Sequence, residues 1–237
     1  QYENLYFSPE IDISVENLKT NTTASKSLKK QEGTYEDFYF NYGLDYDLRN
    51  SRYKPTSGSK TTFLQDLPVV SGNNEISNAF IFTYYKTLKK STQMVGRASV
   101  YLKTIQSLDG EDVRINKRAQ MPYSRLRGFE KGKVGPVENS DYIGGNYISA
   151  LNLSTNLPGV LSTVENIDFS YFIDFGNVWG VDYDASIKDS NEIRSAAGVA
   201  IDIMSAVGPM TFSLAQPITK LSSDTTETFR FNIGTTF

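Results

Sequence analysis

Apolar and polar side chains alternate with a period of two along most of the chain, and the alternation is sharpest over residues 37–48. One face of that segment carries Phe38, Phe40, Tyr42, Leu44, Tyr46 and Leu48, and the other carries Asp37, Asn41, Gly43, Asp45 and Asp47. A period of two is that of a β-strand with two different faces. The same pattern predicts ten strands, at residues 4–18, 35–48, 59–68, 75–88, 92–108, 143–157, 166–179, 192–204, 209–217 and 227–237.

The last predicted strand reaches the final residue of the sequence and ends on an aromatic side chain, Phe237. A strand of this kind is typical of the closing strand of an outer-membrane barrel, in which the terminal aromatic lies in the girdle at the membrane interface. Arg230, Asn232 and Thr236 would then face a polar interior. By the same alternation, Arg97, Lys103, Arg194 and Asp202 are expected to point into the lumen.

The links between the predicted strands alternate in length, which orients the array. Shorter links lie at residues 49–58, 89–91, 158–165 and 205–208, and longer ones at 19–34, 109–142 and 180–191. Short turns belong on the periplasmic side of such a barrel and long loops outside. The alternative is a soluble β-barrel or sandwich. We favour the membrane barrel, because aromatics on one side and charges on the other run the length of nearly every strand.

Composition agrees with this fold class, an all-β transmembrane antiparallel up-and-down barrel. Barrel strands expose only every second residue to lipid, so a mean hydropathy of −0.38 is compatible with 15 Tyr and 14 Phe. No apolar run approaches the roughly 20 residues of a spanning helix. The sequence has no Cys and no His, so we expect no disulfide, metal, cofactor or enzyme activity. A net charge of −3 gives no reason to expect nucleic acid.

A set of short motifs resembles the Omp85 family of outer-membrane protein assembly factors. In chain order these are Leu126-Arg127-Gly128-Phe129, Gly144-Gly145-Asn146, and the segments at residues 172–179, 193–199, 208–213 and 229–237. The resemblance covers essentially the whole chain as a single barrel domain, residues 1–237, and implies the C-terminal part of a sixteen-strand barrel. It also implies a bacterial outer-membrane location and periplasmic POTRA domains, which this chain lacks.

In that family the loop carrying the tetrad folds back into the barrel, and its arginine is held by acidic residues of the inner wall. The resemblance therefore implies that Arg127 pairs with Asp174, that Gly128 permits a tight backbone and that Phe129 anchors apolar surface. A second acidic residue of the family appears here as Ser154, so we expect a thinner set of partners. We interpret the basic stretch from Arg114 to Arg118 as a solvated loop face.

The resemblance implies a chain that folds and inserts client β-barrels without ATP, at a seam lined by the last strand with Phe229, Phe231, Ile233, Gly234 and Phe237. Unfolded barrel clients, membrane lipids and accessory lipoproteins are the implied partners. A secretion pore and an inactive barrel fragment remain alternatives. Because an open strand edge in lipid is costly, we expect the ten strands either to close into a smaller barrel or to represent a truncated gene product. The first residues lack the pattern of a signal peptide, which suggests a mature chain or a fragment.

Overall fold

A computed structural model describes residues 3–158, 167–181, 187, 189, 191–205 and 208–233 of the chain. All ten predicted strands are present and form one antiparallel sheet in sequence order. The strands are β1 (Leu5–Leu18), β2 (Gly33–Asp47), β3 (Gly58–Ser71), β4 (Glu75–Lys89), β5 (Met94–Ser107), β8 (Tyr147–Asn156), β9 (Ile167–Trp179), β10 (Arg194–Ser205), β11 (Gly208–Thr219) and β12 (Phe229–Ile233). The predicted fold class is confirmed. Gly234 and Phe237 lie outside the described residues.

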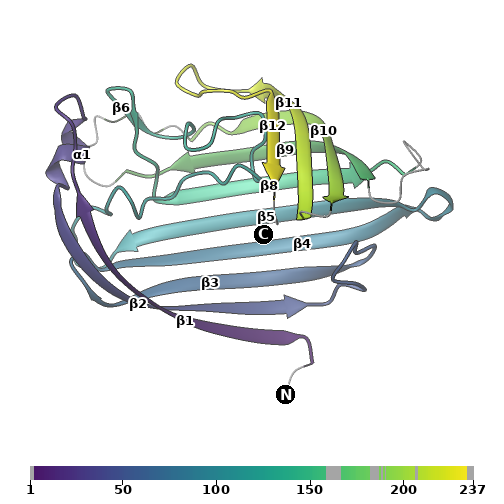
Figure 1. Cartoon of the computed structure of the whole chain (residues 1–237), viewed down its shortest axis with the longest axis horizontal. Helices are drawn as coiled ribbons and strands as arrows, with labels where there is room; N and C mark the ends of the chain where they lie inside the picture. The colour runs from purple at the N-terminus through teal and green to yellow at the C-terminus, as the bar shows by residue number, and fades with distance from the viewer. Residues whose placement is uncertain are drawn as a thin grey trace.

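The sheet curves strongly, so that β10, β11 and β12 run steeply across the direction of the earlier strands (Figure 1). Within the described residues β1 pairs only with β2, and β12 pairs only with β11. These residues therefore form an open, barrel-like sheet, and the expected closure into a smaller ten-strand barrel is not found among them. A second sheet, formed by β6 (Val137–Glu138) and β7 (Asp141–Tyr142), lies within the long link after β5.

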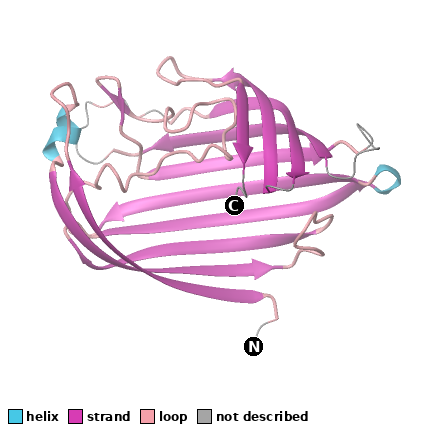
Figure 2. Ribbon diagram, in the orientation of Figure 1, coloured by secondary structure: helices cyan, strands magenta, loops and turns pink. Residues whose placement is uncertain are grey.

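Two short helices mark the opposite ends of the strands (Figure 2). Helix α1 (Lys26–Lys30) lies in the link between β1 and β2, and the 3-10 helix η1 (Lys90–Thr92) lies between β4 and β5. We call the end with α1 the loop end, since it carries the long link at residues 108–146, and the other the turn end. The link at residues 72–74 is an exception, because it is short and yet lies at the loop end. None of the helices in the described part of the chain is long and apolar enough to cross a membrane.

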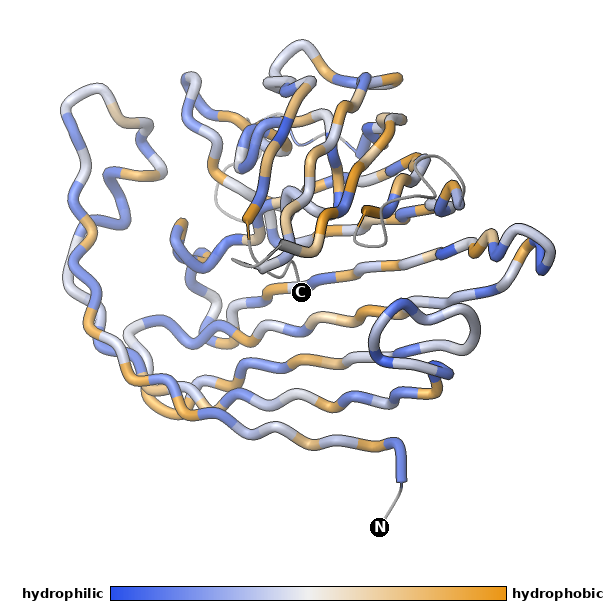
Figure 3. The backbone as a smooth tube through the Cα atoms, turned by 45° about the vertical axis from the view of Figure 1, so that its right-hand side comes forward, coloured by the Kyte–Doolittle hydropathy of each residue, from blue (hydrophilic) through white to orange (hydrophobic). Residues whose placement is uncertain are grey.

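Hydrophobic and hydrophilic residues alternate along the strands (Figure 3), and the two faces of the sheet differ in the side chains that they expose. The outward face exposes large apolar side chains: in β1, Ile11, Ile13 and Val15 are 64%, 76% and 69% exposed. The inward face of the neighbouring β2 instead buries Asp37 and Tyr39. Apolar side chains left uncovered in long rows match the lipid-facing band of an outer-membrane barrel rather than the half-wet sheet of a soluble protein.

The long link at residues 108–146, called the interior loop below, supplies much of the core on the concave side of the sheet. Its side chains Val113, Ala119, Met121, Leu126, Phe129 and Val134 pack in one buried cluster with Ile105, Ile148, Ala150, Val178 and Ala196 of the strands. The expectation that β8 begins at residue 143 is wrong by four residues. Gly144 has φ +70°, a left-handed conformation that ends the extended run before Tyr147.

Candidate functional site: the interior loop and its anchors

Arg127 of the interior loop is clamped onto Asp174 of β9. Its Nε and Nη2 atoms donate to the two carboxylate oxygens at 2.7 and 2.8 Å, and its backbone N–H donates to Oδ2 at 3.1 Å. Asp174 is fully buried, and the guanidinium carbon lies 3.4 Å from the centre of the Phe172 ring. A bidentate pair with a cation–π contact is the geometry in which a buried arginine is best stabilised.

The neighbouring strand β8 adds an amide to this cluster instead of a second carboxylate. The Nδ2 atom of Asn152 donates to Asp174 Oδ1 and to the carbonyl oxygen of Arg125, both at 2.8 Å. Ser154 lies two residues further along the same face and lines the cavity beside Arg127. The side chain of β8 that supports Asp174 is therefore Asn152, which no motif in the sequence marks.

Gly128 allows the interior loop to lie directly against β10 and β11. Its φ is +90°, and a Cβ atom there would lie 3.1 Å from the Cβ of Ala196 and 3.3 Å from that of Ala215. Because Gly128 has no side chain and Ala196 and Ala215 are small, the backbone of the loop lies close to the backbones of β10 and β11. Its carbonyl oxygen accepts a hydrogen bond from the backbone N–H of Glu227, in the link before β12.

Phe129 continues this contact with the last hairpin. Its ring is buried in the concave core together with Leu126, and its backbone forms an isolated antiparallel bridge with Thr226. Its carbonyl oxygen accepts a hydrogen bond of 3.0 Å from Nη2 of Arg230, on β12. The tetrad Leu126, Arg127, Gly128 and Phe129 thus connects β9, β10, β11 and the approach to β12.

Arg114 anchors the other half of the interior loop, and the expectation of a solvated basic face at Arg114 to Arg118 is wrong. Arg114 is 0% exposed and lies between Glu75 of β4 and Asp37 of β2, with Nε–Oε1 and Nη2–Oδ2 distances of 3.1 and 2.8 Å. Arg118 is buried too, with Nη1 2.8 Å from Oδ1 of Asn146. Burial alone would lower the pKa of Arg114, but its bonds with Glu75 and Asp37 raise that pKa above its usual value.

A third arginine fixes the link between β11 and β12. Arg194, at the start of β10, is buried, and its Nε and Nη2 atoms lie 3.0 and 3.1 Å from the two carboxylate oxygens of Asp224. Its predicted inward orientation agrees with this position. The link that leads into β12 is consequently held from two sides, by β10 through Asp224 and by the interior loop through Glu227.

The last strand itself has the two faces that its sequence predicts. Phe229, Phe231 and Ile233 are exposed on the outward side, and Phe231 stacks on Phe212 of β11 with 4.6 Å between ring centres. Arg230 faces the interior loop and also contacts Glu227. The pairing of β12 with β11 extends from Phe229 to Ile233.

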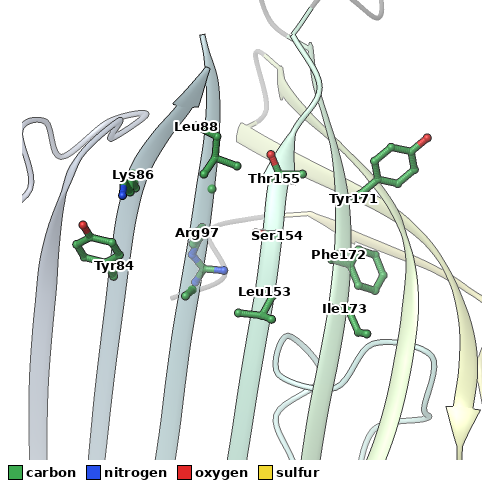
Figure 4. Close-up of a pocket in the computed structure, with 12 residues that line it drawn as sticks. Tyr84, Lys86, Leu88, Arg97, Leu153, Ser154, Thr155, Tyr171, Phe172 and Ile173 are labelled. Carbon is green, nitrogen blue, oxygen red and sulfur yellow. The ribbon is translucent and has the colours of Figure 1, made fainter. Parts of the chain in front are cut away.

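Two concave regions lie near the interior loop, one on each face of the sheet. A cavity of about 940 Å³ opens inside the sheet toward the turn end, below Tyr123, Arg125 and Arg127 of the loop. On the outward face, a groove of about 500 Å³ crosses β4, β5, β8 and β9, with Leu88, Leu153 and Tyr171 along it (Figure 4). In the described part of the chain no three His, Cys, Asp or Glu residues are grouped as a metal would require.

The domain of the Omp85 superfamily matches residues 2–237 of the chain. The chain belongs to the Omp85 superfamily. It is an outer-membrane protein with an Omp85 barrel fold, as the motifs and the alternation predict.

The chain is also similar to individual proteins of this superfamily. The outer membrane protein assembly factor BamA of Neisseria meningitidis serogroup B is 32% identical over 142 residues, which cover 47% of this chain and 17% of that protein. BamA of Neorickettsia risticii is 26% identical over 223 residues, covering 90% of this chain and 29% of that protein. The crystal structure of BamA from Haemophilus ducreyi lacking POTRA domains 1–3 shares the fold, with a TM-score of 0.82, 24% identity and coverage of 97% of this chain and 51% of that one. This Omp85 chain therefore spans well under two thirds of the proteins it matches.

Proposed function

We propose that this chain forms barrel strands of an outer-membrane protein assembly factor, which folds and inserts other β-barrel proteins without ATP. The two BamA relatives, which bear the name of assembly factor, support this proposal. The observation that carries it is the state of β12, which pairs with β11 on one side and with no described strand on the other. An unpaired strand edge is a template for another strand.

The proposed mechanism is strand addition at this edge. Unpaired N–H and C=O groups are very costly in hydrocarbon, so a client strand that pairs with β12 would gain its backbone hydrogen bonds at the moment it enters lipid. The exposed apolar side chains of Phe229, Phe231 and Ile233 would face lipid beside it. Such catalysis is non-enzymatic, because it makes and breaks hydrogen bonds only.

The interior loop is proposed to set the position of the edge. The links from Gly128 to Glu227 and from Phe129 to Arg230 hold the entry to β12, while Arg127 holds the loop to β9. A pinned loop of this kind limits how far the last hairpin can tilt. Client barrels and outer-membrane lipids are the proposed partners, with accessory lipoproteins acting through POTRA domains.

A liposome assay tests the proposal directly. The chain is reconstituted into liposomes, an unfolded β-barrel client is added, and the folded fraction is followed by its protection from protease. We expect faster client folding than in empty liposomes, and a slower rate for Arg127→Ala than for the control Arg52→Ala, which changes an exposed turn residue. Rates equal to those of empty liposomes would remove this function for the chain.

A secretion pore is the second candidate, favoured by the cavity of about 940 Å³ inside the sheet. The buried side chains of the interior loop count against it, because they fill the concave side above that cavity. Conductance across a planar bilayer separates the two functions. Steady channels that widen when Arg127 is replaced by Ala would favour the pore, and a closed bilayer would favour the assembly factor.

A further inference from the structure

The cavity inside the sheet carries an excess of positive charge. Its lining includes two carboxylates, Asp168 and Asp202, and six cationic side chains, which are Lys54, Lys90, Arg97, Arg125, Arg127 and Arg230. Three of the cations already have carboxylate partners: Lys54 pairs with Asp168 at 2.6 Å, Arg127 with Asp174, and Arg230 with Glu227. Asp202 accepts a hydrogen bond from Thr211 instead.

Lys90, Arg97 and Arg125 are left without a carboxylate partner in the described part of the chain, and Lys90 is exposed at the turn end. The side chain of Arg97, on the inward face of β5, forms neither an ion pair nor a hydrogen bond with the described residues. Arg125 is held by neutral groups: its Nη1 donates to Ser99 Oγ at 2.9 Å, and its guanidinium carbon lies 5.2 Å from the centre of the Tyr101 ring. Ser99 is two positions along β5 from Arg97, on the same face, and the two positive charges are close enough to repel each other.

Hydroxyl groups surround this pair of cations. Tyr85 of β4 and Ser154 of β8 lie directly opposite Arg97 on the neighbouring strands, and both line the cavity together with Ser124 of the interior loop. Figure 4 shows Arg97 and Ser154 on adjacent strands. Two guanidinium groups and several hydroxyls supply many hydrogen-bond donors, and a bound anion would remove the repulsion between the arginines.

We propose that Arg97 and Arg125 form an oxyanion-binding site in this cavity and that its ligand is a phosphate group. A phosphate monoester carries close to two negative charges at neutral pH, which matches two guanidinium groups, whereas a carboxylate carries one. Planar guanidinium forks also fit phosphate oxygens in pairs. The contact of Arg125 with Tyr101 and Ser99 holds that fork in place before the ligand arrives.

Titration of the full chain with inorganic phosphate tests the site. The chain is held in zwitterionic detergent micelles at constant ionic strength set with sodium chloride, and binding is followed by phosphorus-31 NMR. Because a charge-assisted hydrogen bond contributes enough to change affinity by about tenfold or more, we expect Arg97→Gln to raise the Kd at least tenfold. Because the side chain of Arg97 forms no ion pair or hydrogen bond with the described residues, we expect Arg97→Gln to keep the fold, and an unchanged melting temperature verifies this.

Lys89→Gln is the matched control, since Lys89 is an exposed cation at the turn end that does not line the cavity. Its Kd should stay within about twofold of the parent value. Phosphate binding that is absent, or equal in the parent and Arg97→Gln, overturns the proposal.

Two further titrations identify the source and the selectivity of the ligand. Phosphatidic acid, whose headgroup is a phosphate monoester, should displace phosphate from the site when it is added to the micelles if the natural ligand is a lipid headgroup. It should leave phosphate bound if the natural ligand is a free phosphate, and both results support a phosphate site. Acetate at the same concentration should not displace phosphate. Displacement by acetate would overturn the assignment to phosphate and indicate a carboxylate site.

Discussion

The backbone N–H of Glu227 donates a hydrogen bond to the carbonyl oxygen of Gly128, with 3.0 Å between the two atoms. This bond joins the interior loop to the link that enters β12, and the neighbouring bond from Glu130 N–H to the carbonyl oxygen of Thr225 extends it. The loop motif and the last strand, which are far apart in sequence, are therefore one structural unit. Substitutions in the interior loop should therefore change the position or stability of β12.

Replacing Arg127 with Ala should release the interior loop. Asp174 would remain fully buried without its cation, and breaking a buried pair in this way costs about 3 kcal/mol or more. We expect a lower melting temperature and faster trypsin cleavage after Lys131, an exposed loop residue. Arg127→Lys keeps the positive charge but loses the planar guanidinium, so its melting temperature and its cleavage rate should lie between those of the parent and Arg127→Ala. Protease sensitivity equal to that of the parent would contradict the anchoring role.

Replacing Arg114 with Met should destabilise the opposite side of the sheet. Glu75 and Asp37 are both buried and would lose their common cation, with a cost of about 3 kcal/mol by the same reasoning. Adding Glu75→Gln should restore part of the loss, because one unpaired charge is then removed. Thermal unfolding of the single and double variants measures this. A double variant no more stable than Arg114→Met would argue against charge burial as the cause.

Replacing Gly128 with Ala should destabilise through two separate effects. The new Cβ would lie 3.1 Å from that of Ala196, and the residue would have to keep φ +90°. A non-glycine residue in this region costs of order 1–3 kcal/mol. Combining it with Ala196→Gly relieves the nearer contact but neither the 3.3 Å contact with Ala215 nor the backbone strain, so rescue should be incomplete. Full rescue in thermal unfolding would show that φ contributes nothing.

The link at residues 72–74 should loosen in acid. The backbone N–H of Asn74, and then the hydroxyl of Ser107, hold the pKa of Asp109 below its ordinary value of 3.8. A carboxyl whose pKa is lowered in the folded chain adds stability above its ordinary pKa, and this is lost as pH falls through the folded value. The protection of the Asn74 amide from hydrogen exchange, relative to an unstructured amide at the same pH, should fall between about pH 5 and about pH 2. Asp109→Asn should abolish this fall in protection, and a fall that survives in the variant would point to another group.

The alternation of side chains predicted all ten strands, because a lipid-facing row and an inward row leave a period of two along each strand. The alternation could not predict that Arg114 is buried and paired. Its partners Asp37 and Glu75 belong to strands that become neighbours of the loop only after the sheet curves. The inward phase of these two acids at the loop end was the available signal. Asn152 was missed for a related reason: an amide that supports a carboxylate has no sequence pattern of its own.

The long-range contacts of the interior loop also bear on the order in which the chain folds. Neighbouring strands are consecutive in sequence, so hairpins can form early from local contacts. The contacts of the interior loop instead join residues that are 39 positions apart for Arg114 with Glu75, 47 for Arg127 with Asp174 and 101 for Phe129 with Arg230. Such contacts require the wall to be in place first. The interior loop is thus expected to dock last. Its contacts can form only when every strand around it has reached its final register, so docking of the loop stabilises the correctly paired sheet alone.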